Sequence, residues 1–278
     1  MKRPVLALLM PVVALAIVAG FAAVRLQDDS GGKTSADSSA AEADAQSPGG
    51  APRLAPQGNV CQGILHRPDP GGPRIFAPEY TQKREANGLA IVGNANVDPR
   101  ALDEAAATVE RFFRSNNLEE PLAADGAYVI VLDSKQGVLD LPEFKCMDNA
   151  SNQAFFSHVC GVADRADYPV VTVGEEDLLG SRSGPCAGLN ILYHEIGHLV
   201  QGWTMGPADF VDVHLFYQDA LSAGKYRRDY ANTNADEYFA EATQAYFLSS
   251  DAEGEHDRAW LKDYDPQIYE MVARLYGD

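Results

Sequence analysis

The pattern His194-Glu195-Ile196-Gly197-His198 restricts this chain of 278 residues more than any other feature of its sequence. On an α-helix a step of four residues turns the chain by about 400°, so the two histidines stand one turn apart on the same face. Two imidazoles placed in this way can bind a single zinc ion. The sequence therefore predicts a metal-binding helix. The alternative is a pair of helical histidines that form ordinary hydrogen bonds.

The residues around this pattern favour a buried catalytic helix. Apolar side chains flank the histidines, as an active-site helix inside a protein requires, and they are Ile191, Leu192, Ile196, Leu199 and Val200. A zinc ion lowers the pKa of a water molecule that it binds, and Glu195 is placed to accept a proton from that water. Glu195 is therefore the candidate general base. A catalytic zinc also needs a third protein ligand and one open position.

Two sources of a third ligand are disfavoured by the sequence. The longer metzincin pattern requires Gly at position 201 and His at position 204, where this chain has Gln201 and Thr204. His214 is the next histidine along the chain, but it lies in the amphipathic stretch VDVHLFY, where a lone histidine is more often structural. The third ligand is therefore expected further along the chain.

The segment DYANTNADEYFAEATQAYF, residues 229–247, offers the better candidates. The polar residues at 232–234 are typical of a helix start, and Glu237 and Glu241 follow one turn apart on the expected helix. Glu237 is the candidate zinc ligand. Glu241 is placed to accept the free ring N–H of a ligating histidine, which would fix the orientation of that ring. The alternative is an exposed acidic face of an amphipathic helix.

Upstream of these motifs, strands and helices are expected to alternate. Short apolar runs predict strands at 89–93, 127–132 and 168–173. Asp98 and Pro99 are a typical N-cap and first residue for a helix that continues over 100–115. A further helix is expected at 265–277. The Pro- and Gly-rich stretch 59–87 predicts an irregular segment, and 133–167 a stretch rich in loops.

The N-terminal part of the chain predicts export. Lys2 and Arg3 precede an uncharged apolar run at 4–24, which is long enough to cross a bilayer as an anchor. Gly20-Phe21-Ala22 offers a cleavage site, so residues 1–26 are either a signal peptide or a membrane anchor. Residues 27–58 are rich in Ser, Ala, Gly, Asp and Pro, which predicts a disordered linker. Residues 59–278 would then form the folded domain outside the cytoplasm.

Charge and cysteine content agree with this organisation. The chain has 22 Lys and Arg against 40 Asp and Glu, a net charge of −18 that disfavours nucleic acid as a partner. Its four cysteines lie in the expected folded domain and predict two disulfides, with three pairings open. Pairing Cys146 with Cys160 would close a short loop and leave Cys61 beside Cys186. No C-x-x-C spacing indicates a cysteine metal site.

The two motifs together carry a family resemblance. HEIGH at 194–198, followed by YANTNADEYFAEA at 230–242, resembles the zinc protease domain of anthrax toxin lethal factor and its bacterial relatives, a group of glutamate zincins. The likeness covers residues 185–278. It implies zinc on His194, His198 and Glu237, with Glu195 as general base and Glu241 in contact with a ligating histidine. The implied fold is α+β and zincin-like, with a small mixed sheet and an active-site helix.

The resemblance also points to Tyr230, whose phenol would stabilise the oxyanion formed during hydrolysis. The alternative for Tyr230 is a tyrosine that packs a loop. The expected activity is zinc-dependent hydrolysis of peptide or protein substrates outside the cytoplasm. Two alternatives stay open, namely an exported zinc-binding or scaffold module without catalysis and a zinc hydrolase that acts on a non-peptide amide bond.

Overall fold

The computed structural model describes residues 76–156, 159–165, 168–181, 186, 188–249 and 256–277. The predicted leader and linker, residues 1–58, lie outside these ranges. No helix within the described ranges is both long enough and apolar enough to cross a membrane. All described residues belong to one unit of the chain.

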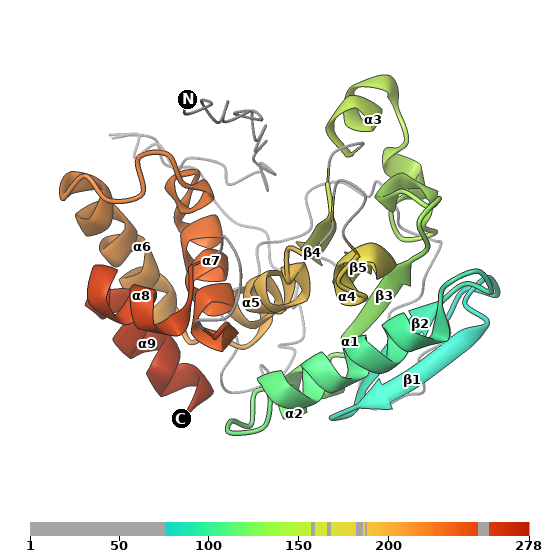
Figure 1. Cartoon of the computed structure of the whole chain (residues 1–278), viewed down its shortest axis with the longest axis horizontal. Coiled ribbons are helices and arrows are strands. Elements are labelled where there is room, and N and C mark those ends of the chain that lie inside the picture. The colour runs from blue at the N-terminus through green and yellow to red at the C-terminus, as the bar shows by residue number, and fades with distance from the viewer. Residues whose placement is uncertain are drawn as a thin grey trace, which may run out of the picture. The chain divides into compact units, whose positions relative to one another are not determined.

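The described strands form one mixed sheet, in the order β1-β2-β3-β5-β4 (Figure 1). The strands are β1 (Gln82–Ala86), β2 (Leu89–Gly93), β3 (Tyr128–Leu132), β4 (Gly161–Arg165) and β5 (Tyr168–Gly174). The three central strands run parallel, and the outer strands β1 and β4 are antiparallel to their neighbours. Central parallel strands are buried on both faces, which is why their sequences are continuous apolar runs. The predicted strands at 89–93, 127–132 and 168–173 are therefore confirmed to within one residue.

Alternate residues of β3 pack into two hydrophobic clusters on opposite faces of the sheet. Val129 and Val131 face the larger cluster, which includes apolar residues of α1 (Pro99–Phe112) and α5 (Ile191–Trp203). Tyr128 and Ile130 face the smaller cluster, which is completed by apolar residues between positions 138 and 144. The sheet thus separates the helical side of the domain from the segment that follows β3.

The helices are formed largely where the sequence predicts them. Asp98 accepts a hydrogen bond from the backbone N–H of Arg100 and caps α1, as expected, although α1 ends three residues before the predicted limit. Helices α6 to α9 gather on one side of α5, and the sheet lies on its other side (Figure 1). The remaining helices are α2 (Glu119–Ala124), α3 (Ala150–Phe156), α4 (Glu175–Leu178), α6 (Pro207–Ser222), α7 (Ala235–Phe247), α8 (Arg258–Tyr264) and α9 (Pro266–Tyr276). The last of these confirms the helix predicted at the C-terminal end.

Two expectations of irregular structure are wrong in part. The stretch 59–87, predicted to be irregular, contains strand β1, which pairs with β2 across an Asn87-Gly88 turn. Both turn residues have positive φ, 50° and 76°, which is the conformation that an Asn-Gly hairpin turn requires. The stretch 133–167, predicted to be rich in loops, contains α3 and the edge strand β4.

The predicted cysteine pairing is also wrong. Cys160 is bonded to Cys186, with 5.3 Å between their Cα atoms, and is therefore not bonded to Cys146. The reason is topological, because β4 runs antiparallel to β5 and so begins beside the end of β5, near the loop that leads to α5. Cys146 is disulfide-bonded as well, and Cys61 lies outside the described residues. Disulfides are typical of an oxidising compartment.

Candidate metal centre

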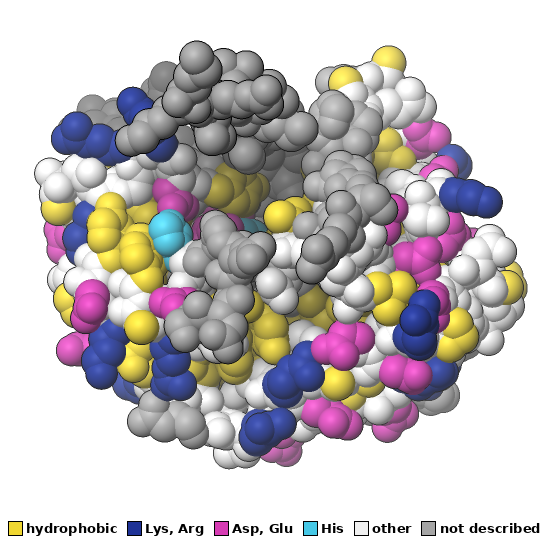
Figure 2. Space-filling view, viewed as in Figure 1, with side chains coloured by type: hydrophobic (Ala, Val, Ile, Leu, Met, Phe, Trp, Pro, Cys, Tyr) yellow, Lys and Arg dark blue, Asp and Glu magenta, His cyan; other side chains and the backbone are white. Residues whose placement is uncertain are grey.

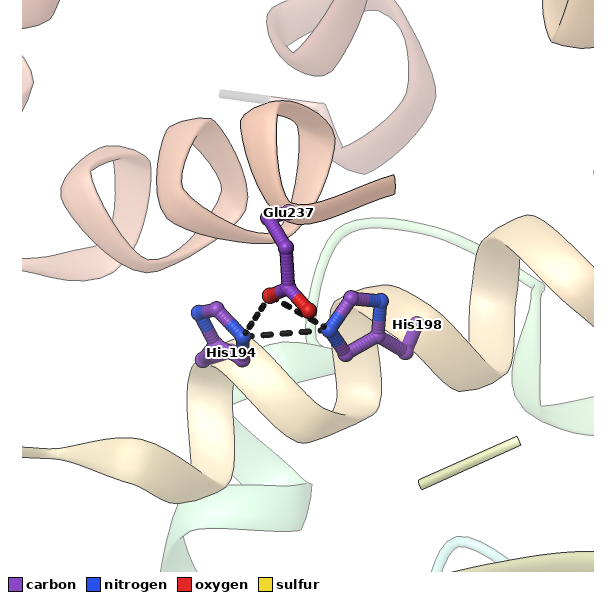
Figure 3. A group of neighbouring side chains, drawn as sticks. All are labelled: His194, His198 and Glu237. Carbon is purple, nitrogen blue, oxygen red and sulfur yellow. Dashed lines mark hydrogen bonds and ion pairs between the residues drawn. The ribbon is translucent and has the colours of Figure 1, made fainter. Parts of the chain in front are cut away.

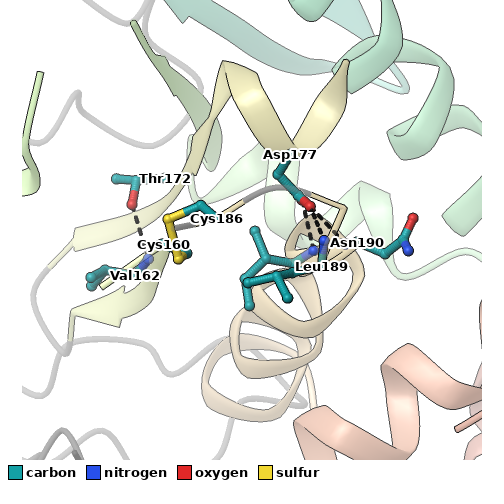
Figure 4. The surroundings of a disulfide bond; sticks show 8 residues. Cys160, Val162, Thr172, Asp177, Cys186, Leu189 and Asn190 are labelled. Atoms are coloured by element: carbon teal, nitrogen blue, oxygen red, sulfur yellow. Dashed lines mark hydrogen bonds between the residues drawn. A yellow bond between two sulfur atoms is a disulfide. The ribbon is translucent and has the colours of Figure 1, made fainter. Parts of the chain in front are cut away.

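The start of helix α5 is held by a side chain from another helix. Asn190 precedes α5 with a positive φ of 52° and does not cap it through its own side chain. Instead Asp177, on α4, accepts hydrogen bonds from the backbone N–H groups of Leu189 (2.5 Å), Asn190 (2.8 Å) and Ile191 (2.8 Å), as Figure 4 shows. Burial raises the pKa of Asp177, although these N–H groups act in the opposite direction. No local sequence pattern indicates this cap, because Asp177 lies more than ten residues upstream of the residues that it caps.

Helix α7 is capped locally, as predicted. The side-chain oxygen of Asn234 accepts hydrogen bonds from the backbone N–H groups of Asp236 (2.8 Å) and Glu237 (2.9 Å). This cap orients the first turn of α7, and Glu237 lies in that turn. The expected helix start at 232–234 is thus confirmed, with Asn234 as the capping residue.

Close packing brings α7 against α5. A Cβ atom at Gly197 would lie only 3.0 Å from Cβ of Thr243, so the glycine inside the HEIGH pattern allows the two helices to approach. A hydrogen bond of 2.9 Å from Gln201 to Asp236 joins the same helices. Glu237 is therefore carried towards the histidines by tertiary packing that no short sequence pattern encodes.

Three donor atoms from these helices converge, as Figure 3 shows. Nε2 of His194 lies 3.1 Å from Oε2 of Glu237 and 3.1 Å from Nε2 of His198, which in turn lies 3.2 Å from the same Oε2. Ligand atoms about 2 Å from a tetrahedral zinc ion would be separated by about 3.3 Å. These three residues form the metal-capable group found among the described residues, and their spacing fits zinc.

The electrostatics of this group follow from burial and from the charge on Glu237. Burial acts to raise the pKa of Glu237, but its contacts with His194 and His198 hold that pKa well below the usual value. Burial acts to lower the pKa of His194, yet Glu237 and Glu241 raise it well above the usual value. Oε1 of Glu241 lies 3.0 Å from Nδ1 of His194, the ring nitrogen that faces away from the other donors. Glu241 therefore lies close to the ring nitrogen with which it is expected to interact.

Glu195 lies beside this group and is buried, with 5% of its surface exposed. Burial raises the pKa of Glu195 to about 7, against the attraction of His194 and His198, while the charge of Glu237 raises it further. A carboxyl group with such a pKa can both accept and donate a proton near neutral pH. Acidic and histidine side chains are visible in a hollow near the middle of the face shown in Figure 2.

Tyr230 lies over His194 at the start of a short 3₁₀ turn, Tyr230–Asn232. The two rings are nearly parallel, with 5.9 Å between their centroids and 26° between their planes. Burial raises the pKa of Tyr230, and the negative charge of Glu237 raises it further. The phenol therefore keeps its proton and can act as a hydrogen-bond donor.

His214, the alternative third ligand, lies outside this group. It is exposed on α6, and its Nδ1 lies 2.9 Å from the backbone oxygen of Phe210 in the preceding turn. The structure thus brings together His194, Glu195, His198 and Glu237, with Glu241 and Tyr230 at the edge of the group. These are the six residues singled out in the sequence.

Comparison with known proteins identifies a matching family. The family described as anthrax toxin lethal factor, N- and C-terminal domain, matches residues 79–275. The match begins three residues before β1 and ends in the last turn of α9. It therefore covers the whole sheet and also helices α5 and α7, which carry the two motifs. No curated protein matches the chain. Because the match covers well over half of the sequence, the chain belongs to the anthrax toxin lethal factor family.

Proposed function

We propose that this chain is an exported zinc metallopeptidase with a zincin-like fold. The observation that carries the proposal is the convergence of three donor atoms within 3.2 Å of one another, beside a buried glutamate. His194, His198 and Glu237 would hold the zinc ion, which when bound polarises the scissile carbonyl and lowers the pKa of water. The chain also belongs to the lethal factor family, which is a family of zinc metalloproteases, and this supports the same conclusion.

The chemistry of the reaction falls to three other side chains. Glu195 accepts a proton from the attacking water and returns it to the leaving amine, since it is buried beside the three donor atoms without being one of them. Tyr230 donates a hydrogen bond to the oxyanion that develops on the scissile carbonyl. Glu241 faces Nδ1 of His194 and holds the ring so that Nε2 points towards the metal.

An enzyme fits these residues better than a scaffold with a structural zinc. Structural zinc sites are usually closed by four protein ligands, whereas the metal-capable group among the described residues supplies three. A structural site also has no use for Glu195, a carboxylate that is buried next to the ligands without being one of them. The fourth coordination position of the proposed site would be left for water and a substrate.

Several features support action outside the cytoplasm. The Cys160–Cys186 disulfide indicates an oxidising compartment. The apolar run at 4–24 would direct export or tether the chain to a membrane, and residues 27–58 would separate that tether from the folded domain. The substrates would then be exported or extracellular peptides or proteins.

Metal content and peptide cleavage test the proposed function together. We expect the purified chain to contain about one zinc ion per molecule, measured by mass spectrometry, and to cleave members of a random peptide library. A chelator should abolish cleavage, and added zinc should restore it. A chain that binds zinc but cleaves neither peptides nor other amides would be a scaffold, and cleavage of cell-wall amides alone would identify a different hydrolase.

Replacement of Tyr230 by Phe removes only the phenolic oxygen. We expect kcat for a cleaved peptide to fall by about 10²–10³-fold, the usual cost of losing one oxyanion donor, with KM and zinc content nearly unchanged. Tyr269→Phe on α9 is the matched control and should behave like the wild type. Equal kcat values for the two variants would assign Tyr230 to packing alone.

A further inference from the structure

The start of the edge strand β4 approaches the proposed general base very closely. A Cβ atom built at Gly161 would lie 2.7 Å from Oε1 of Glu195 and 2.8 Å from its Cγ, distances that real Cβ atoms do not show. Gly161 is not among the glycines with positive φ, so its backbone conformation is open to other residues. Glycine is therefore needed at this position for space next to Glu195 rather than for backbone freedom.

Packing is what orients the Glu195 carboxylate. Among the described residues, none forms a hydrogen bond with this side chain, and His194, His198 and Glu237 act on it through their charges. A general base must be held in a narrow range of orientations to accept a proton efficiently. The backbone of Gly161 is a rigid surface that limits where the carboxylate can turn.

The residues on both sides of Gly161, Cys160 and Val162, are tied to neighbouring segments, and Figure 4 shows both of them. The preceding residue, Cys160, is bonded to Cys186 in the loop before α5. The following residue, Val162, donates its backbone N–H to Oγ1 of Thr172 at 2.9 Å, which holds β4 on β5. Because Asp177 fixes the start of α5 in the same region, neither β4 nor the helix can easily move away from the other.

We propose that Gly161 is a positioning residue for Glu195. Its backbone lies against the Glu195 side chain and fixes the orientation in which the carboxylate accepts the proton. Any side chain at position 161 would displace the carboxylate. This inference rests on the proposed peptidase function, in which Glu195 is the base. Catalysis would then also depend on Gly161, which lies outside the HEIGH pattern and outside the segment at 230–242. Gly161 belongs to the edge strand β4, which was not predicted from the sequence.

A Gly161→Ala variant of the zinc-loaded chain tests the catalytic part of this proposal. We expect kcat to fall by about 10–100-fold with KM and zinc content unchanged, because a displacement of about 1 Å can cost a factor of this size. Gly174→Ala, at the last residue of β5, is the matched control, since a Cβ atom there would meet nothing within 4 Å. It should keep the wild-type kcat. A wild-type kcat for Gly161→Ala would overturn the proposal.

A double-mutant cycle, in which Tm values are measured without zinc, tests the contact independently of activity. The Tm loss caused by Gly161→Ala is expected to shrink by about half in a Glu195→Ala background, since the displaced side chain is then absent. The rest of the loss reflects the backbone oxygen of Thr172, which a Cβ at Gly161 would approach to 2.8 Å. Equal Tm losses in the two backgrounds would overturn the proposal.

These two experiments separate the inference from the function on which it rests. If the wild-type chain cleaves no peptide, the proposed function fails. The double-mutant cycle of Tm values still decides whether Gly161 restrains Glu195. If Gly161→Ala alone does not fold, the double variant should fold because the overlap with Glu195 has been removed. A double variant that also fails to fold would overturn the proposal.

Discussion

A Glu195→Gln variant should lose nearly all peptide hydrolysis while it keeps its zinc. The amide has the size of the carboxylate but cannot accept a proton at neutral pH, and loss of a general base typically costs about 10²–10⁴-fold in rate. Glu195 lies beside the three donor atoms without being one of them, so zinc binding should be unaffected. The measurements are kcat/KM for a cleaved peptide and zinc content by mass spectrometry.

Glu110→Gln provides the matched control for this change. Glu110 is exposed on α1, and the same loss of charge there should leave both kcat/KM and zinc content unchanged. Retained hydrolysis in Glu195→Gln would show that another group accepts the proton. Loss of zinc together with hydrolysis would mean that Glu195 helps to assemble the site, and its assignment as the base would then lack support.

The parts of the site that the sequence predicts correctly are those fixed by local geometry. The spacing of His194 and His198 determines their common face on any α-helix, so their convergence needs no knowledge of the fold. The cap at Asn234 is equally local, because its side chain binds backbone groups two and three residues further on. Glu237 is a different case, since its candidacy comes from the chemical need for a third ligand and from the family resemblance.

The parts that the sequence does not predict depend on contacts between distant residues. Asp177 caps α5 from α4, and Gly161 reaches Glu195 from an edge strand whose short sequence, GVADR, lacks a clear strand pattern. The pairing of Cys160 with Cys186 follows from the antiparallel course of β4, which itself was not predicted. The hairpin at Asn87-Gly88 is an exception, because its turn sequence is a strong local indication that the Pro- and Gly-rich surroundings obscured.

A Glu237→Ala variant should lose zinc. Changes to residues that merely support a metal ligand commonly cost about 10–100-fold in affinity, so removal of a ligand should cost at least about 100-fold. If wild-type zinc is present at about 1,000 times its Kd, that loss lowers the stabilisation by zinc from about 4 to about 1.4 kcal/mol. The corresponding rise in Tm on adding zinc should shrink by about 5–10 °C. Calorimetry with and without zinc measures this difference.

The difference between zinc-loaded and zinc-free Tm is the informative quantity, because Glu237 also matters to the metal-free protein. Its carboxylate lies within 3.2 Å of both histidines and holds the pKa of His194 high, so its removal changes the stability of the metal-free form as well. Glu241→Ala, one turn further on the same helix, is the matched control and should lose less zinc affinity, since Glu241 faces Nδ1 of His194 rather than the metal. If Glu237→Ala keeps the wild-type zinc content and the wild-type zinc-dependent rise in Tm, the third ligand lies elsewhere. His214 would then be the first residue to replace.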